Sequence, residues 1–193
     1  MANVLVIVAG YLLGSLSAAW IITRLFGKID IRSEADGRIS PASVYYRLGT
    51  LPYILAALLD ILFAATAVIL AQVVTHSNTV AMLSGLAAMI GHNWSLLLKL
   101  KGGQGATTMT GTLAVIMFWQ LCCGLAIAAL VVAITRRSTI ATAIGICVVV
   151  IAAILKFGLI VPAFYPLGLF SIMLIKRLQL SRASKRKILN ATK

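Results

Sequence analysis

The run Met109–Ile134, MTGTLAVIMFWQLCCGLAIAALVVAI, decides the fold of this 193-residue chain, because it can form either one helix or two. None of its 26 residues is charged, and a membrane-spanning helix needs about 20 predominantly apolar residues. One long helix carries the chain across a membrane once, whereas two short helices return it to the side from which it came. The choice therefore sets the sidedness of every later segment.

The composition places the chain in a membrane. It is 61% hydrophobic and 11% charged, with a mean hydropathy of +1.05, whereas an average soluble domain is about 45–50% apolar and about 25% charged. A soluble globular domain is therefore excluded. The first apolar run is expected to remain as the first helix, because no basic segment of a signal peptide precedes it. Six runs are long enough to be spans: Val4–Phe26, Leu51–Val74, Val80–Leu98, Met109–Ile134, Thr139–Leu155 and Phe157–Ile175.

The basic residues indicate how the chain is threaded, because short cytoplasmic loops are enriched in Lys and Arg. With six crossings and an outside N-terminus, eight basic residues face the cytoplasm and nine face outward, which is no bias. If Met109–Ile134 enters and returns, sixteen face the cytoplasm and only Lys156 faces outward. We therefore predict two short helices of about 12 residues each, about 18 Å long, with the break near Phe118–Leu121.

The expected architecture is an all-α polytopic membrane protein with about seven transmembrane helices, two of them short. Its N-terminus lies outside, its C-terminus is cytoplasmic, and residues 1–193 form a single domain. The net charge of +13 comes from short basic clusters between apolar runs, which favours contact with anionic lipid over nucleic-acid binding. The three cysteines lie inside apolar runs and give neither a disulfide framework nor a metal spacing: Cys122, Cys123 and Cys147.

A glycine-rich segment, Lys101-Gly102-Gly103-Gln104-Gly105, is the first candidate site. Three glycines in four residues let successive backbone N–H groups converge on an anion, and the next helix contributes its N-terminus. Lys101 would add a point charge. The alternative is a simple turn with Lys101 as an anchor. Nearby His92 is a candidate general base, phosphate ligand or helix-end hydrogen-bond donor.

Two acidic regions also stand out. Asp60 lies in the middle of an apolar run, and an ionisable group at membrane depth usually has a partner or a function. No basic residue lies within one helical turn of Asp60, so its partner must come from another helix. The loop Gly27–Thr50 holds three of the four acidic residues, which either form a solvated connector or pair with neighbouring bases.

Several short motifs make the chain resemble the bacterial acyl-phosphate:glycerol-3-phosphate acyltransferases, the PlsY family. The resemblance implies seven helices in the bacterial inner membrane. It also implies transfer of an acyl group from acyl phosphate to the 1-hydroxyl of glycerol 3-phosphate, giving lysophosphatidic acid and phosphate without a metal or other cofactor. The matching motifs are Tyr11-Leu12-Leu13-Gly14-Ser15, Asp30-x-Arg32, Arg47-Leu48-Gly49, Leu59-Asp60, Gly91-His92 and Lys101-Gly102-Gly103-x-Gly105-x-x-Thr108.

The resemblance also implies roles for individual residues. His92 and Lys101 would be catalytic, and Asp60 would be a buried structural polar group. The partners would be acyl phosphate, glycerol 3-phosphate or a related phosphorylated acceptor, and membrane lipids, with no nucleic acid. The substrate phosphates would be held by Arg38, Ser40, Ser43, Arg47, Gly102, Gly103, Gln104, Gly105, Lys176, Arg177 and Gln179.

This chain departs from the family in the residues that would hold phosphate. The signature Gly-Ser-Gly-Asn-x-Gly-x-Thr-Asn aligns with residues 35–43 and keeps only Gly37. Gln104 replaces a lysine, Phe63-Ala64 replaces a Lys-Gly pair, and Arg38 and Lys176 bring new cations. The alternative to an active enzyme is an impaired or inactive family member that binds lipid or a membrane partner. A small transporter is disfavoured, because no inverted repeat is visible.

Overall fold

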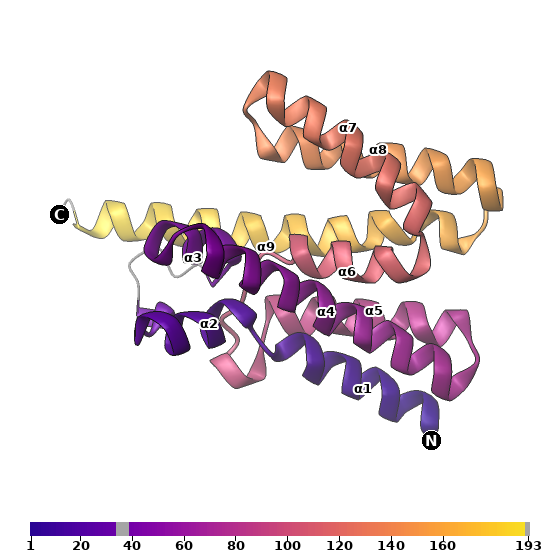
Figure 1. Cartoon of the computed structure of the whole chain (residues 1–193), viewed down its shortest axis with the longest axis horizontal. Helices are drawn as coiled ribbons and strands as arrows, with labels where there is room; N and C mark the ends of the chain where they lie inside the picture. The colour runs from indigo at the N-terminus through magenta and orange to yellow at the C-terminus, as the bar shows by residue number, and fades with distance from the viewer. Residues whose placement is uncertain (34–38, 192–193) are drawn as a thin grey trace.

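The computed structural model describes residues 1–33 and 39–191, and within these residues it is helical, with no strand. Figure 1 shows the arrangement. The elements are α1 (Ala2–Ser15), α2 (Ala18–Gly27), η1 (Ile31–Ser33), α3 (Pro41–Leu48), α4 (Thr50–Thr75), α5 (Asn78–Asn93), η2 (Leu96–Leu98), α6 (Ala106–Ile116), α7 (Phe118–Thr135), α8 (Ser138–Phe157) and α9 (Val161–Ala191).

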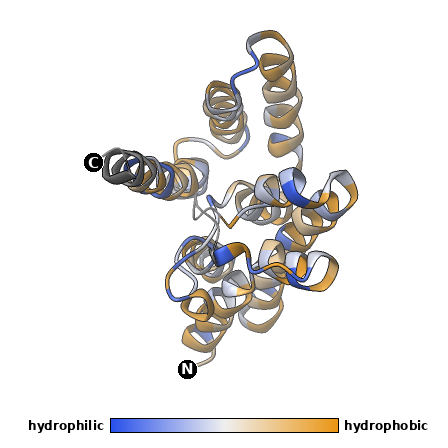
Figure 2. Cartoon of the chain, turned by 90° about the vertical axis from the view of Figure 1, so that its left-hand side faces the viewer, coloured by the Kyte–Doolittle hydropathy of each residue, from blue (hydrophilic) through white to orange (hydrophobic). Residues whose placement is uncertain are grey.

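The predicted class, an all-α polytopic membrane protein, is confirmed. Five segments of the described residues are long and apolar enough to cross a membrane: Ala2–Gly27, Thr50–Thr75, Asn78–Leu98, Phe118–Thr135 and Ser138–Phe157. The short α6 and the long α9 account for the remaining apolar runs. Seen from the end that carries α2, α3 and the C-terminus, hydrophilic residues lie mainly in connections and near helix ends (Figure 2). The count of seven crossings and the sidedness stay predictions.

The first apolar run is a candidate span over Ala2–Gly27, in agreement with the prediction, but its helix is interrupted. The helix breaks at Leu16 and Ser17, and α2 then restarts at Ala18. Ser17 caps α2 by accepting a hydrogen bond from the N–H of Trp20 at 3.4 Å, a role that serine fills well. The break leaves the first N–H groups of α2 without helical partners, and one of them meets Asp60.

The run Met109–Ile134 is divided in two as predicted, but the two helices are unequal. The break falls at Met117, and α6 has 11 residues whereas α7 has 18. The expectation of two helices of about 12 residues is therefore wrong. Met117 leaves the helical region with φ −142° and ψ 53° while its side chain is buried. No glycine or proline marks that position, so tertiary packing places the break.

The last helix also differs from its predicted range. α9 begins at Val161 rather than Phe157 and continues to Ala191. Pro162 accounts for the later start, because proline is favoured in the first turn, where its missing N–H is not needed. The apolar first part of α9 therefore leads without interruption into the basic part of the chain.

The helices form a tightly packed group and a pair that is set apart from it. α1, α4, α5 and α6 pack closely, and the hydroxyl of Ser84 on α5 donates to the carbonyl of Ala67 on α4 at 2.9 Å. α7 and α8 pair with each other and splay away from this group (Figure 1). Only 17% of the residues of α7 are buried, against 61% in the most apolar stretch of Asn78–Leu98. The splay leaves space between α6 and the α7–α8 pair.

Candidate active site

A buried carboxylate–imidazole pair forms the polar centre of the tight helix group. Asp60 in α4 and His92 near the end of α5 are 2% and 3% exposed, and Asp60 Oδ1 lies 3.8 Å from His92 Nδ1. The same carboxylate accepts hydrogen bonds from the backbone N–H of Ala18 at 3.2 Å and from the Thr107 hydroxyl at 3.0 Å. Its partners thus come from α2, α5 and α6, as the lack of a basic neighbour on α4 required.

The glycine-rich segment lies directly on His92. The N–H of Gly103 donates to the carbonyl of His92 at 3.1 Å. A Cβ at Gly102 would collide with the backbone carbonyl of His92, and a Cβ at Gly103 would collide with its imidazole Nε2. Gly105 begins α6 with φ +79°, a conformation that glycine adopts without strain. These glycines are therefore needed to seat the segment against the imidazole.

Lys101 stands at the rim of this segment. Its side chain is exposed, and within the described part of the chain no carboxylate lies within ion-pair distance of it. Lys99 and Leu100 both have left-handed backbone conformations, with φ of +55° and +61°. This tight bend turns the chain just before Lys101. Gln104, in the same segment, is half-buried.

The first loop reaches the same centre through Ile39. This residue is fully buried, and its carbonyl lies against Gly103. Ser40 caps α3 by accepting from the N–H of Ser43 at 3.4 Å, and the two hydroxyl oxygens are 3.2 Å apart. Ser40 and Ser43 are thus part of a helix start beside the glycine-rich segment. Arg47 lies exposed about 10 Å farther along α3.

The predicted residue Arg38 lies outside the described residues. Asp30, at the start of the same loop, pairs with Arg24 at 2.8 Å and with Arg32 at 2.7 Å. Both guanidinium groups also lie over the ring of Trp20, at 5.9 and 5.5 Å from its centroid. The hydrogen bond from Arg32 holds the pKa of the Asp30 carboxyl well below its usual range. This ion cluster anchors the loop to α2.

The α9 candidates reach the centre through Trp94. Lys176 is 5% exposed, and its ammonium group lies 5.2 Å from the Trp94 ring centroid. Gln179 accepts a hydrogen bond from the Trp94 indole N–H at 3.2 Å, and Arg177 beside them is half-buried. Because Trp94 follows His92 by two residues, it links α9 to the polar centre.

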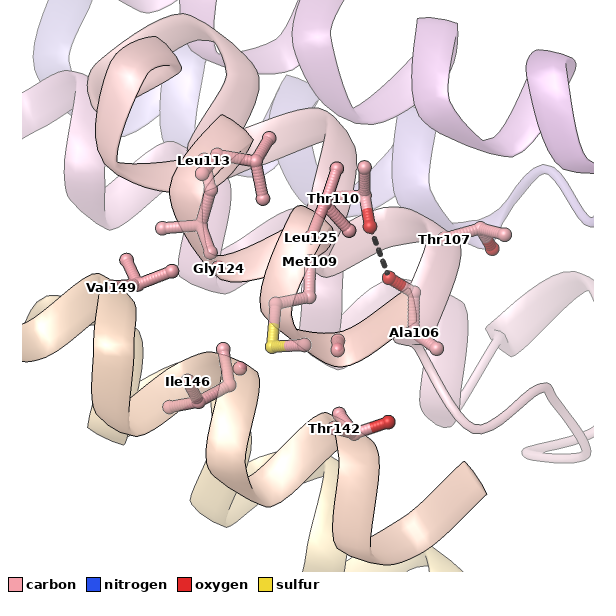
Figure 3. A pocket seen from close by; sticks show the side chains of 13 residues that line it. Ala106, Thr107, Met109, Thr110, Leu113, Gly124, Leu125, Thr142, Ile146 and Val149 are labelled. Atoms are coloured by element: carbon pink, nitrogen blue, oxygen red, sulfur yellow. Dashed lines mark hydrogen bonds between the residues drawn. The ribbon is translucent and has the colours of Figure 1, made fainter. Parts of the chain in front are cut away.

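An apolar cavity of about 240 Å³ opens between α6, α7 and α8. Figure 3 shows Leu113, Leu125, Ile146 and Val149 around it, with Thr107 at one edge. Since Thr107 also donates to Asp60, the apolar space begins where the polar centre ends. The arrangement can accept a ligand with a charged head and an apolar tail.

Comparison with known proteins agrees with this geometry. The sequence pattern of the glycerol-3-phosphate acyltransferase family matches residues 4–187. The chain belongs to this family. A glycerol-3-phosphate acyltransferase of Shouchella clausii (strain KSM-K16) is 35% identical over 161 residues, which cover 82% of this chain and 77% of the relative. A glycerol-3-phosphate acyltransferase 2 of Moorella thermoacetica (strain ATCC 39073 / JCM 9320) is 30% identical over 145 residues, 73% of this chain and 74% of the relative.

Solved structures of the acyltransferase family share the fold. The glycerol 3-phosphate form of PlsY (YgiH), an integral membrane glycerol 3-phosphate acyltransferase, superposes with a TM-score of 0.81. The match covers 97% of this chain and 94% of that one at 20% identity. The lysophosphatidic acid form gives 0.80 at 19% identity. At these identities the likeness establishes the fold alone.

Three residues at the centre of this acyltransferase-family chain were missed by sequence reasoning. The Ala18 N–H becomes a donor only because the first helix breaks, and alanine carries no signal of that. Thr107 is one of several threonines at the start of α6, and only the fold selects it. Trp94 lies two residues after His92, so its position was a usable signal.

Proposed function

We propose that this protein transfers an acyl group from acyl phosphate to glycerol 3-phosphate, forming lysophosphatidic acid for phospholipid biosynthesis. Membership of the glycerol-3-phosphate acyltransferase family supports the reaction. The observation that carries the proposal is the position of the Asp60–His92 pair. It touches the glycine-rich segment on one side and, through Thr107, the apolar cavity on the other. Polar and apolar parts of an acyl phosphate would meet there.

The glycine-rich segment and Lys101 would hold the substrate phosphates. Backbone N–H groups at the start of α6 have no helical partners and favour an anion. Lys101 is exposed and so can swing onto a phosphate oxygen. Because both substrates are negatively charged, positioning and charge stabilisation would supply much of the rate.

His92 would act on the acceptor hydroxyl, oriented by Asp60. The hydroxyl oxygen of glycerol 3-phosphate forms an ester bond with the acyl carbonyl carbon, and the bond between that carbon and the phosphate oxygen breaks. The hydroxyl proton ends on the departing phosphate. The acyl chain would occupy the apolar cavity, which follows α6 from Thr107 to Leu113, about 9 Å of helix.

A second candidate function is lipid binding by a catalytically inactive family member. The observation that favours it is the loss of cations near the centre. Phe63, at a position where the family has lysine, packs against an apolar cluster that includes Ala18 and Ala56, and Gln104 carries no charge. Losing one charged phosphate contact costs about 10- to 150-fold in binding.

The test is an acyl-transfer assay with purified protein in lipid, supplied with palmitoyl phosphate and glycerol 3-phosphate. Phosphate release and lysophosphatidic acid are both measured, and Lys101→Ala is the control. Because Lys101 is exposed, the control variant should fold normally yet lose about 10- to 150-fold in turnover. Folded wild-type protein without turnover would favour the second candidate. Equal turnover by both proteins would remove Lys101 from the reaction.

A further inference from the structure

A second cavity, which has polar side chains in its lining, lies at the end of the bundle opposite His92. It has a volume of about 420 Å³ and is bordered by the ends of α4, α6 and α8 and the starts of α5 and α9. Its polar lining is Gln72, Asn78 and Lys156. Gln72 follows Asp60 by twelve residues, about 18 Å along α4. In Figure 1 this end carries the N-terminus, whereas α3 and the C-terminus lie at the other. The cavity is therefore separate from the candidate active site.

The lining of this cavity suits an anion. Lys156 is exposed, and among the described residues no carboxylate lies within ion-pair distance of it. The Gln72 side chain donates to Asn78 Oδ1 at 3.1 Å, which turns the Asn78 NH₂ group to other acceptors. A cation and amide donors thus face one space with no acidic residue in its lining.

An apolar slot adjoins the polar cavity. It has a volume of about 280 Å³, lies between α5 and α9, and shares Met82 and Pro162 with the polar cavity. From Thr79 to Leu86 it follows α5 for about 10 Å. The polar cavity lies at the ends of the candidate spans, where lipid headgroups are expected, and the slot runs from there along α5 toward the middle of the span Asn78–Leu98.

We propose that the two cavities together bind one anionic phospholipid. The phosphate of its headgroup contacts Lys156 and the Asn78 amide, and one acyl chain lies in the slot between α5 and α9. Charge complementarity selects an anionic headgroup, and the adjoining slot selects a lipid over a free phosphate, because a free phosphate leaves the apolar walls unused. This site is independent of acyl transfer at His92.

Two substitutions test the two halves of the site. Lys156→Gln removes the charge from an exposed side chain. Gly168→Leu fills the slot, and a Cβ at this helical glycine meets nothing nearer than Leu86 Cδ2 at 4.0 Å, so the variant should fold. Matched controls are Arg137→Gln, an exposed cation at the turn before α8, and Ser171→Leu, an exposed position on α9 outside the slot.

The measurement is a titration of the full-length protein in detergent with phosphatidylglycerol, read by native mass spectrometry. We expect each test variant to weaken binding of the first lipid by about tenfold or more, from the lost charge contact or the blocked methylene groups. The two control variants should bind like the parent protein, and inorganic phosphate should not displace the lipid.

Other outcomes overturn the proposal. Unchanged binding by Lys156→Gln would remove the headgroup contact. Weakened binding by Lys156→Gln with unchanged binding by Gly168→Leu would show that the slot holds no acyl chain. Displacement of the lipid by inorganic phosphate at equal concentration would identify a phosphate-ion site instead. Equal weakening by Arg137→Gln would show that only overall charge matters.

Discussion

Asp30 and Asp60 are both carboxylates in a chain rich in apolar residues, but they are held in opposite kinds of surroundings. The Asp30 side chain is 26% exposed and pairs with two arginines at 2.7 and 2.8 Å. The Asp60 side chain is 1% exposed and is held by a backbone N–H, a hydroxyl and a nearby imidazole. Exposed ion pairs contribute little to stability, whereas a buried carboxylate must be hydrogen-bonded.

Asp30 anchors a loop, whereas Asp60 lies where we propose that the chemistry occurs. The Asp30 cluster fixes one end of a loop with charges that water screens. The Asp60 centre brings α2, α5 and α6 to one point, beside both the glycine-rich segment and the apolar cavity. We propose that burial and the convergence of helices, rather than the number of charged partners, mark the functional centre.

Replacing Asp60 should be the most damaging change. Asp60→Ala leaves the Ala18 N–H and the Thr107 hydroxyl buried without their acceptor, and we expect unfolding free energy to fall by about 2–4 kcal/mol. Acyl transfer should be lost with it. Thermal unfolding in detergent, followed by circular dichroism, checks the first effect. Asp60→Asn, which keeps an acceptor oxygen, is the control and should unfold nearer to wild type; equal unfolding of Asp60→Ala and wild type would contradict the account.

A methyl group at Gly103 should displace the imidazole of His92. We expect Gly103→Ala to lose about 100-fold in turnover, the scale of a 1 Å misplacement of a catalytic group. Gly168→Ala is the matched control, because its new methyl group has free space. Steady-state assays of both variants check the contrast. Similar rates for the two would mean that the glycine-rich segment does not touch the reaction centre.

Narrowing the apolar cavity should change substrate preference rather than abolish activity. Ala128 lines the cavity, and Ala129 beside it on α7 is exposed and does not. We expect Ala128→Phe to lower turnover of palmitoyl phosphate by about tenfold relative to decanoyl phosphate. Ala129→Phe should leave this ratio unchanged. A ratio unaffected by Ala128→Phe would place the acyl chain elsewhere.

The smallest effect should come from Asp30 and should depend on pH. Its pKa is lowered in the folded protein, so it stabilises the fold above its unfolded pKa of about 3.9, and this contribution shrinks as pH falls from that value toward the lower pKa of the folded state. The melting temperatures of wild type and Asp30→Asn should differ slightly at neutral pH, and the difference should shrink as pH falls below about 4. A difference that grows on acidification would have the wrong sign.

The membrane class and most helix ranges could be predicted from sequence, because apolar runs and basic clusters are strong signals. The division of Met109–Ile134 followed from charge distribution alone. The position of the break at Met117 could not be predicted, because no glycine or proline marks it. The break at Leu16 and Ser17 was also missed, because an apolar run reads as one helix even when Ser17 can cap a second.

The candidate site was only partly predictable. His92 and Asp60 stood out because ionisable residues are rare inside apolar runs, and the glycine-rich segment stood out because three of its last four residues are glycine. Their mutual contact depends on the packing of α4 against α5 and α6, which residue types do not specify. The roles of Ala18 and Thr107 arise from that packing. The predicted phosphate-binding roles of Ser40, Ser43 and Lys176 stay predictions, and their observed contacts are a helix cap and the Trp94 ring.

The most direct test of the account is a side-by-side acyl-transfer assay of Asp60→Asn and Asp30→Asn, each purified in lipid and checked for folding. Both variants replace one carboxylate by an amide of nearly the same shape. We expect Asp60→Asn to lose at least about 100-fold in turnover, the scale of acid–base catalysis, and Asp30→Asn to retain most of it. Equal losses in the two variants, or wild-type turnover by folded Asp60→Asn, would contradict the assignment of catalysis to the buried centre.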